Sequence, residues 1–161
     1  MLAAGAATRF GSAKQALLLP GVVERVRAAP SVAEIVVVAG AHPLDDAGER
    51  VVECPDWQLG PGASLRCGFA ALDASAEAAV VVLADGPGLA SEAIERVVAA
   101  WRDGAGDVVA ASYGGTRGHP VLIARAAWAD VPDEGARALD PVLVPCDDLG
   151  APGDVDTPDD L

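Results

Sequence analysis

Residues 78–87 read AAVVVLADGP, a short β-branched apolar run that is followed directly by a carboxylate and a Gly-Pro turn. A continuous apolar run of this length is typical of a strand buried on both faces of a parallel sheet, and we expect that strand over Ala78–Ala84. Similar runs predict four further strands, at Glu34–Ala39, Asp107–Ala111, Val121–Ala124 and Val142–Val144.

Helical stretches lie between these runs, at Val22–Ala29, Ser64–Ala74 and Ser91–Arg102. The last two begin at serines, which suit the N-cap position. In the last stretch, apolar residues recur at the spacing of one helix face. Strands that alternate with helices predict a layered α/β fold with right-handed crossovers, in which ligands bind beyond the carboxyl ends of the strands.

Length and charge narrow the class of protein. The 161 residues suit a single domain, which we expect to span positions 1–161. A formal net charge of −13 argues against nucleic-acid binding and against anionic membranes. No apolar stretch approaches the roughly 20 residues of a membrane span, and no signal peptide is recognisable. Cys54, Cys67 and Cys146 form no C-x-x-C pair, which favours reduced thiols in a cytoplasmic protein.

The segment Leu2–Lys14, LAAGAATRFGSAK, is the first candidate binding loop. Its small residues allow close approach of a ligand to backbone N–H groups, and Arg9 and Lys14 can bind phosphate oxygens. Lys14 is the only lysine of the chain. The segment matches neither a Walker A loop nor a dinucleotide fingerprint, and an ordinary Gly/Ala turn is the alternative.

Acidic residues supply the candidate metal ligands. Asp85 comes directly after a predicted buried strand, where a hard oxygen ligand suits Mg²⁺ bound to phosphates. Asp154 and Asp156 lie on the same side of an extended backbone and can add a second carboxylate. The alternatives are a solvated turn at Asp85 and a solvated acidic C-terminus.

Two further residues lie in segments that can contact a ligand. His119 lies in GGTRGHP, between glycines and a proline, although a lone loop histidine is more often a structural hydrogen bonder. Trp57 can stack on a flat substrate, and a half-buried core tryptophan is an equally good interpretation. No Ser/His/Asp or Cys/His nucleophile arrangement is present.

Taken together, the segments resemble the MobA-like NTP-transferase family, in particular the molybdenum cofactor cytidylyltransferases. The resemblance rests on LAAGAATRFGSAKQ, PDWQLGPGASLRCGF, VVVLADGP, GGTRGHPVLI, DEGAR and GDVDTPDDL, which occur in family order over nearly the whole chain. It implies a three-layer α/β/α sandwich with a mostly parallel sheet, like that of the nucleotide-diphospho-sugar transferases.

The resemblance also implies roles for single residues. Leu2, Ala3, Ala4 and Gly5 would wrap the nucleotide, together with Ser64 and Leu65. Arg9, Lys14 and Asp85 would carry catalysis, with Asp85, Asp154 and Asp156 holding Mg²⁺. Trp57 and His119 would contact the acceptor. Ala4, where guanylyl members tend to have glycine, favours CTP.

The implied reaction is transfer of CMP from CTP to the phosphate of molybdopterin, with release of pyrophosphate. The implied partners are CTP or another NTP, a phosphorylated pterin acceptor, and a molybdoenzyme or its chaperone. One alternative is a guanylyltransferase or a sugar- or polyol-phosphate nucleotidyltransferase on the same fold. Another is a nucleotide-binding regulator without catalysis. A phospho-receiver domain is disfavoured, because it requires a lysine near the C-terminus.

Overall fold

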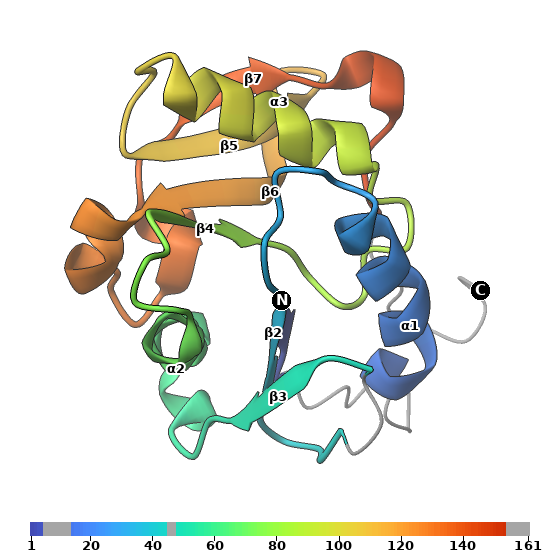
Figure 1. Ribbon diagram of the computed structural model, residues 1–161, viewed down its shortest axis with the longest axis vertical. Helices are drawn as coiled ribbons and strands as arrows, with labels where there is room; N and C mark the ends of the chain where they lie inside the picture. Colours follow the sequence, from blue (N-terminus) through green and yellow to red (C-terminus); the bar gives the residue numbers. More distant parts are fainter. Residues whose placement is uncertain (5–13, 45–47, 154–161) are drawn as a thin grey trace.

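The computed structural model describes residues 1–4, 14–44 and 48–153 of the chain (Figure 1). Within these ranges it is a mixed α/β structure. The strands are β1 (Leu2–Ala3), β2 (Val36–Ala39), β3 (Arg50–Glu53), β4 (Ala78–Val81), β5 (Val108–Tyr113), β6 (Thr116–Ala124) and β7 (Val142–Pro145). The helices of more than two turns are α1 (Lys14–Arg27), α2 (Pro61–Ala71) and α3 (Ser91–Arg102). Short 3₁₀ turns are η1 (Trp57–Leu59), η2 (Arg125–Asp130), η3 (Gly135–Ala138) and η4 (Asp147–Leu149).

The strands form two groups that meet at β1. The order β1-β2-β3 is parallel throughout, whereas the order β4-β6-β5-β7 is mixed. In the second group, β6 runs antiparallel to both β4 and β5, and β7 runs parallel to β5. The two groups are joined where the Leu2 N–H donates to the Val82 carbonyl, at 2.9 Å, and the Ala84 N–H donates to the Leu2 carbonyl, at 3.0 Å.

All five predicted strands are confirmed, and two more are present. β1 is only two residues long, and β3 has charged residues at both ends, so neither produces a clear apolar run. β6 begins earlier than predicted, at Thr116, because a two-residue turn at Gly114 and Gly115 pairs it with β5. Both glycines have positive φ, 59° and 75°, which is the geometry of a tight hairpin.

Side chains of adjacent strand residues point to opposite faces of a sheet, so each face can pack against its own helices. Leu122 packs with α1 and α3 in one core cluster, whereas its neighbours Val121 and Ile123 pack with α2 in another. In the same way, β5 sends Val109 to the first cluster and Ala110 to the second. Helices therefore cover both faces of the sheet, and the predicted α/β/α sandwich is confirmed.

The helix starts differ from the prediction at three places. α2 begins at Pro61 rather than Ser64, because proline suits the first helical turn and Gly60 adopts the preceding conformation at φ 131°. α3 has Ala90 at its N-cap, so Ser91 is its first helical residue. α1 begins at Lys14, well before the predicted Val22. Within the described ranges, no helix has the length and apolar character that crossing a membrane requires.

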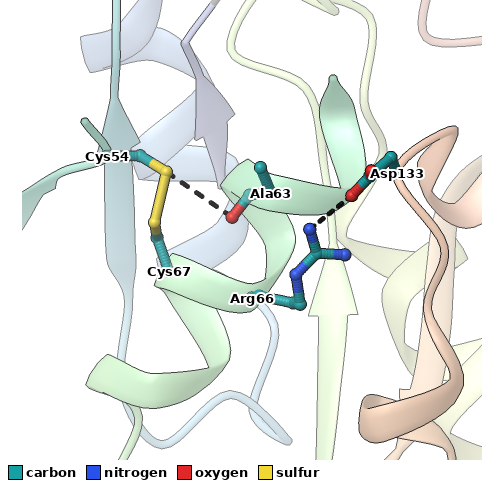
Figure 2. Close-up of a disulfide and its surroundings, with 5 residues drawn as sticks. All are labelled: Cys54, Ala63, Arg66, Cys67 and Asp133. Atoms are coloured by element: carbon teal, nitrogen blue, oxygen red, sulfur yellow. Dashed lines mark hydrogen bonds and ion pairs between the residues drawn. A yellow bond between two sulfur atoms is a disulfide. The ribbon is translucent and has the colours of Figure 1, made fainter. Parts of the chain in front are cut away.

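The expectation of three reduced thiols is wrong for one pair. Cys54, directly after β3, is disulfide-bonded to Cys67 of α2, with a Cα–Cα distance of 5.8 Å (Figure 2). The two cysteines are 13 positions apart, so no local spacing rule reveals the pair, and only the packing of α2 beside the end of β3 brings them together. Cys146 is a free, buried thiol, as expected.

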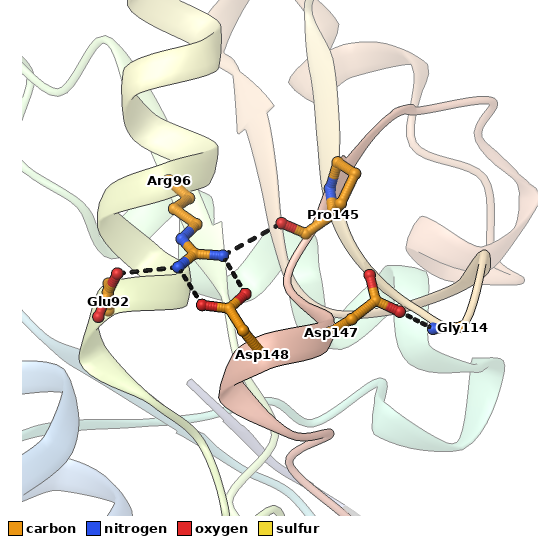
Figure 3. Close-up of polar contacts among 6 residues, drawn as sticks. All are labelled: Glu92, Arg96, Gly114, Pro145, Asp147 and Asp148. Carbon is orange, nitrogen blue, oxygen red and sulfur yellow. Dashed lines mark hydrogen bonds and ion pairs between the residues drawn. The ribbon is translucent and has the colours of Figure 1, made fainter.

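A group of charged residues fastens the segment after β7 to the rest of the molecule (Figure 3). The Arg96 guanidinium of α3 contacts both carboxylate oxygens of Asp148, at 2.6 and 2.7 Å, and Glu92 at 2.9 Å. Asp147 accepts a hydrogen bond from the Gly114 N–H of the β5–β6 turn. The Arg96 contact lowers the pKa of Asp148. These contacts set the course of the chain toward Ala151–Gly153, which lines the site described next.

Candidate functional site

Two adjoining hollows lie at the edge of the sheet where the parallel strands end. The first, here called the central hollow, has a volume of about 320 Å³. The second, the flanking hollow, has a volume of about 370 Å³ and shares Leu83 with the first. The central hollow is lined by residues that include Leu2, Ala3, Ala4, Trp57, Ser64 and Asp85. The flanking hollow is lined by residues that include Gly86, Tyr113, Thr116, Arg117, His119 and Gly153.

Several residues that line the central hollow are small, so a ligand there can approach the backbone closely. Ala3 and Ala4 line it at the end of β1, and neither has a side chain beyond Cβ that would keep a ligand away from the backbone. Gly40, directly after β2, lies so close to its neighbours that a Cβ there would be 2.8 Å from the Cβ atoms of both Ala4 and Trp57. Because Gly40 has no side chain, Trp57 can pack directly against the end of β2, and this sets the position of Trp57 in the lining of the hollow.

Two oxygen-bearing side chains line the same space. Asp85 is half-buried and follows the strand segment that pairs with β1. Ser64, in the first turn of α2, is only 3% exposed. A carboxylate and a hydroxyl beside small residues at the carboxyl edge of the sheet can bind a ligand that carries phosphates and a divalent cation.

His119 is a side chain of the flanking hollow that senses the charge of Asp85 in the central one. Its imidazole lines the flanking hollow, and the charge of Asp85 acts on it. Burial lowers the pKa of His119, and the charge of the nearby Arg117 lowers it further. The charge of Asp85 acts in the opposite direction, and the resulting pKa lies below the usual 6.5. The phenol of Tyr113 donates to the His119 carbonyl at 2.9 Å, and burial raises the pKa of this tyrosine to about 12. His119 is therefore a neutral donor or acceptor at neutral pH.

Among the described residues that line the flanking hollow, Arg117 carries a positive charge, and it was not singled out from the sequence. Its guanidinium donates to the carbonyls of Leu139, at 2.8 Å, and of Ala136. Burial lowers the pKa of Arg117, and the negative charge of Asp140 offsets part of this effect. The only sequence signal was its place two residues before His119, in the segment GGTRGHP. The contacts hold the 3₁₀ turn η3 against the hairpin and place a positive charge beside the hollow.

The architecture matches solved structures over nearly the whole chain. A crystal structure of an Rv0371c homologue from Mycobacterium sp. strain JC1 is 24% identical with a TM-score of 0.79, and the match covers 99% of this chain and 90% of that one. Rv0371c from Mycobacterium tuberculosis H37Rv is 26% identical with a TM-score of 0.75, covering 99% and 92%. A manganese complex of the same protein is 25% identical with a TM-score of 0.75 and the same coverage. A search of curated protein sequences returns no match.

The family profile described as "MobA-like NTP transferase domain" matches residues 1–140. The chain belongs to the MobA-like NTP transferase family. This membership makes the protein a nucleotidyltransferase that acts on a nucleoside triphosphate, in a family that depends on a divalent metal. Both hollows lie at the carboxyl edge of the sheet, which is where ligands bind in open α/β folds.

Several residues selected from the sequence come together in this MobA-like fold. Leu2, Ala3, Ala4, Ser64 and Asp85 all line the central hollow, although they come from three distant segments of the chain. Trp57 lies with them and not with His119, which lines the other hollow.

Other selected residues lie elsewhere. The side chain of Leu65 is buried in the core with Phe69 and Val121, so it packs α2 against the sheet and does not line the central hollow. Lys14 is the first residue of α1, and its side chain is outside the described part of the structure. The remaining selected residues, Gly5, Arg9, Asp154 and Asp156, also lie outside the described residues.

The metal of a MobA-like transferase needs oxygen ligands, and Asp85 suits it. Among the described residues, no group of three or more His, Cys, Asp and Glu side chains comes together. Mg²⁺ is often held by one or two carboxylates together with substrate phosphates, so one carboxylate beside a nucleotide-sized space fits such an ion.

The lowered pKa of His119 predicts a pH dependence of stability. In the unfolded chain this histidine titrates near 6.5, above its value in the folded protein, so the unfolded state binds more protons between the two values. The free energy of unfolding should therefore fall as the pH drops below about 6.5. His119→Gln should flatten this fall, measured by urea unfolding between about pH 5 and 7.5. An equally steep fall in the variant would contradict the assigned shift.

Proposed function

We propose that this protein is a Mg²⁺-dependent cytidylyltransferase that transfers CMP from CTP to the phosphate of molybdopterin and releases pyrophosphate. The observation that carries the proposal is the convergence of Ala3, Ala4, Ser64 and Asp85 on one hollow of a MobA-like fold. The single domain at positions 1–161, its cytoplasmic location and a molybdoenzyme or chaperone that receives the product belong to the same proposal.

In this proposal the central hollow binds CTP. Backbone groups at Ala3 and Ala4 approach the nucleotide closely, since neither residue has a side chain beyond Cβ. Ala4 supports CTP over GTP, because guanylyl members similar to this chain tend to have glycine there. Trp57, which the family resemblance assigned to the acceptor, lines this hollow instead, so we assign its flat apolar face to the base of CTP.

The flanking hollow binds the acceptor. It adjoins the central hollow through Leu83, so an acceptor phosphate held there would face the triphosphate. His119, neutral at pH 7, can donate a hydrogen bond to an acceptor oxygen, and Arg117 supplies positive charge beside it. These two groups favour an anionic acceptor within a protein of net charge −13.

The chemistry is a displacement at the α-phosphorus without a covalent enzyme intermediate. The acceptor phosphate is already anionic, so the reaction needs no strong general base. Arg9 and Lys14 neutralise charge on the transferred and leaving phosphates, and the walls of the two hollows hold the reacting groups in line. Asp85, with Asp154 and Asp156, would hold Mg²⁺, which when bound supplies further charge neutralisation on the phosphates.

Calorimetric titration tests the proposal. CTP, GTP, ATP and NAD are each titrated with Mg²⁺, with Mn²⁺ and without metal. We expect metal-dependent binding with the lowest Kd for CTP, and no heat with NAD, which lacks a triphosphate. Preferred binding of GTP would contradict the CTP assignment and favour a guanylyltransferase. Absence of binding for every NTP would contradict the whole proposal.

A turnover assay distinguishes a nucleotidyltransferase from a nucleotide-binding regulator without catalysis, which is the alternative that the sequence leaves open. With a phosphorylated pterin as acceptor, CTP should be consumed and pyrophosphate released in equal amounts. A sugar or polyol phosphate accepted in its place would move the protein to another nucleotidyltransferase class. Binding of CTP with no pyrophosphate release on any acceptor would favour the regulator.

A further inference from the structure

We propose that the Cys54–Cys67 disulfide is a reversible clasp on the wall of the central hollow, so that thiol–disulfide exchange regulates nucleotide binding. The regulatory part of this inference rests on the proposed function, because it requires that the central hollow bind an NTP. The structural part, that the bond holds the wall in shape, is independent of any ligand.

The disulfide joins two elements that both form the hollow. Cys54 begins the segment that carries Trp57 and Gly60, and Cys67 lies on α2, one turn after Ser64. The Cys54 N–H also donates to the Ala39 carbonyl of β2, at 2.9 Å, which anchors the start of the segment. One covalent bond therefore ties the segment that carries Trp57 to the helix that carries Ser64, and both residues line the space that Asp85 also lines.

α2 has a second attachment, on its other side, that does not depend on cysteine (Figure 2). Arg66 donates to the Val131 carbonyl at 3.0 Å and forms an ion pair with Asp133. The Gly62 N–H donates to the Asp133 carbonyl at 2.9 Å. When the disulfide opens, these contacts keep α2 on the sheet, so the change is confined to the segment that carries Trp57.

The reduced pair also has a place in the fold. The Cys54 sulfur lies 3.5 Å from the Ala63 carbonyl, within reach of a hydrogen bond from a thiol. Cys54 is only 2% exposed, so this carbonyl gives the buried thiol a partner after reduction. Both redox states are therefore compatible with the packing around Ala63.

The exchange step needs a dithiol reductant, and Cys67 is the point of attack. Cys67 is half-buried, whereas Cys54 is buried. A thiolate of the dithiol attacks the Cys67 sulfur, the S–S bond breaks, and Cys54 leaves as a thiolate that takes up a proton. The second thiolate of the dithiol then displaces Cys67, which takes up the other proton. The pair gains two electrons and two protons, and the dithiol becomes a disulfide.

The test compares oxidised and dithiothreitol-reduced protein. Under denaturing conditions, the oxidised chain should show one reactive thiol, that of Cys146, and the reduced chain three. Hydrogen exchange of residues 54–60 should be faster after reduction, with α3 unchanged. If residues 54–60 of the reduced protein adopt the CTP-binding conformation about one tenth of the time, the Kd for CTP rises about tenfold.

Variants keep the test specific. Cys67→Ala should bind CTP as the reduced protein does and should not respond to dithiothreitol. Cys146→Ala is the matched control, because Cys146 is buried in the core away from the hollow, and it should keep the full response. Unchanged exchange at residues 54–60, or equal CTP affinity in the two redox states, would overturn the clasp. Absence of CTP binding in both states would instead overturn the proposed function, and the exchange data would still report on the wall.

Discussion

Asp85→Asn is expected to lower the kcat of nucleotidyl transfer by about 10²–10³-fold, the usual cost of removing one charged group that acts on the transition state. The substitution keeps the size and shape of the side chain and removes only the carboxylate charge that is proposed to hold the metal. Since asparagine fills the same half-buried space, the Tm should change little. Steady-state turnover and thermal unfolding measure the two effects.

A second measurement ties the effect to the geometry of the site. Asp85 raises the pKa of His119, so removing its charge should lower the pKa of that imidazole further, which can be followed by NMR titration. The matched control is Asp103→Asn, at the exposed C-terminus of α3, which should leave both kcat and His119 unchanged. Turnover of Asp85→Asn within twofold of the natural protein would remove Asp85 from the proposed site.

Gly62→Ala is expected to destabilise the fold by about 3 kcal/mol, because overpacking against backbone cannot relax. A Cβ at Gly62 would overlap the Pro132 carbonyl oxygen and lie 2.9 Å from the Asp133 Cα. The Tm should fall by about 6–12 °C, as expected for a chain of this size. To relieve the overlap, α2 would have to move away from residues 132–133. Ser64 lies on α2 and lines the central hollow, so it should move as well, and CTP binding should weaken.

Gly21→Ala is the matched control for this substitution. Gly21 also lies inside a helix, α1, and a Cβ there would meet no atom of the described residues within 4 Å. Alanine at this position should stabilise the protein by up to about 1 kcal/mol, through helix propensity alone. Thermal unfolding of both variants gives the comparison, and a stable Gly62→Ala protein would contradict the packing of α2 against Pro132.

Five strands could be predicted from the sequence because each contains a short continuous apolar run, as β2 does with four buried residues. β3 and β1 could not, since β3 has charged residues at both ends and β1 has only two residues. The edge strand β7 could be predicted although Val142 and Leu143 are exposed, because its apolar run is visible in the sequence. Leu65 shows the corresponding limit within a motif. A motif names the residues of a segment, but the direction of each side chain depends on how the helix packs, and this one packs into the core.

The sequence by itself determined the layered α/β class and the position of Asp85, because both depend on local order along the chain: an apolar run, then a carboxylate, then a turn. It also determined the family, since six short segments occur in order. Only the tertiary structure decided which of the two glycines tolerates a side chain and that Cys54 meets Cys67. It alone placed Trp57 with Asp85 and the Arg117 guanidinium against the carbonyls of Ala136 and Leu139. These relations join residues that are distant along the chain, and such distances are set by how helices pack on the sheet rather than by any local pattern.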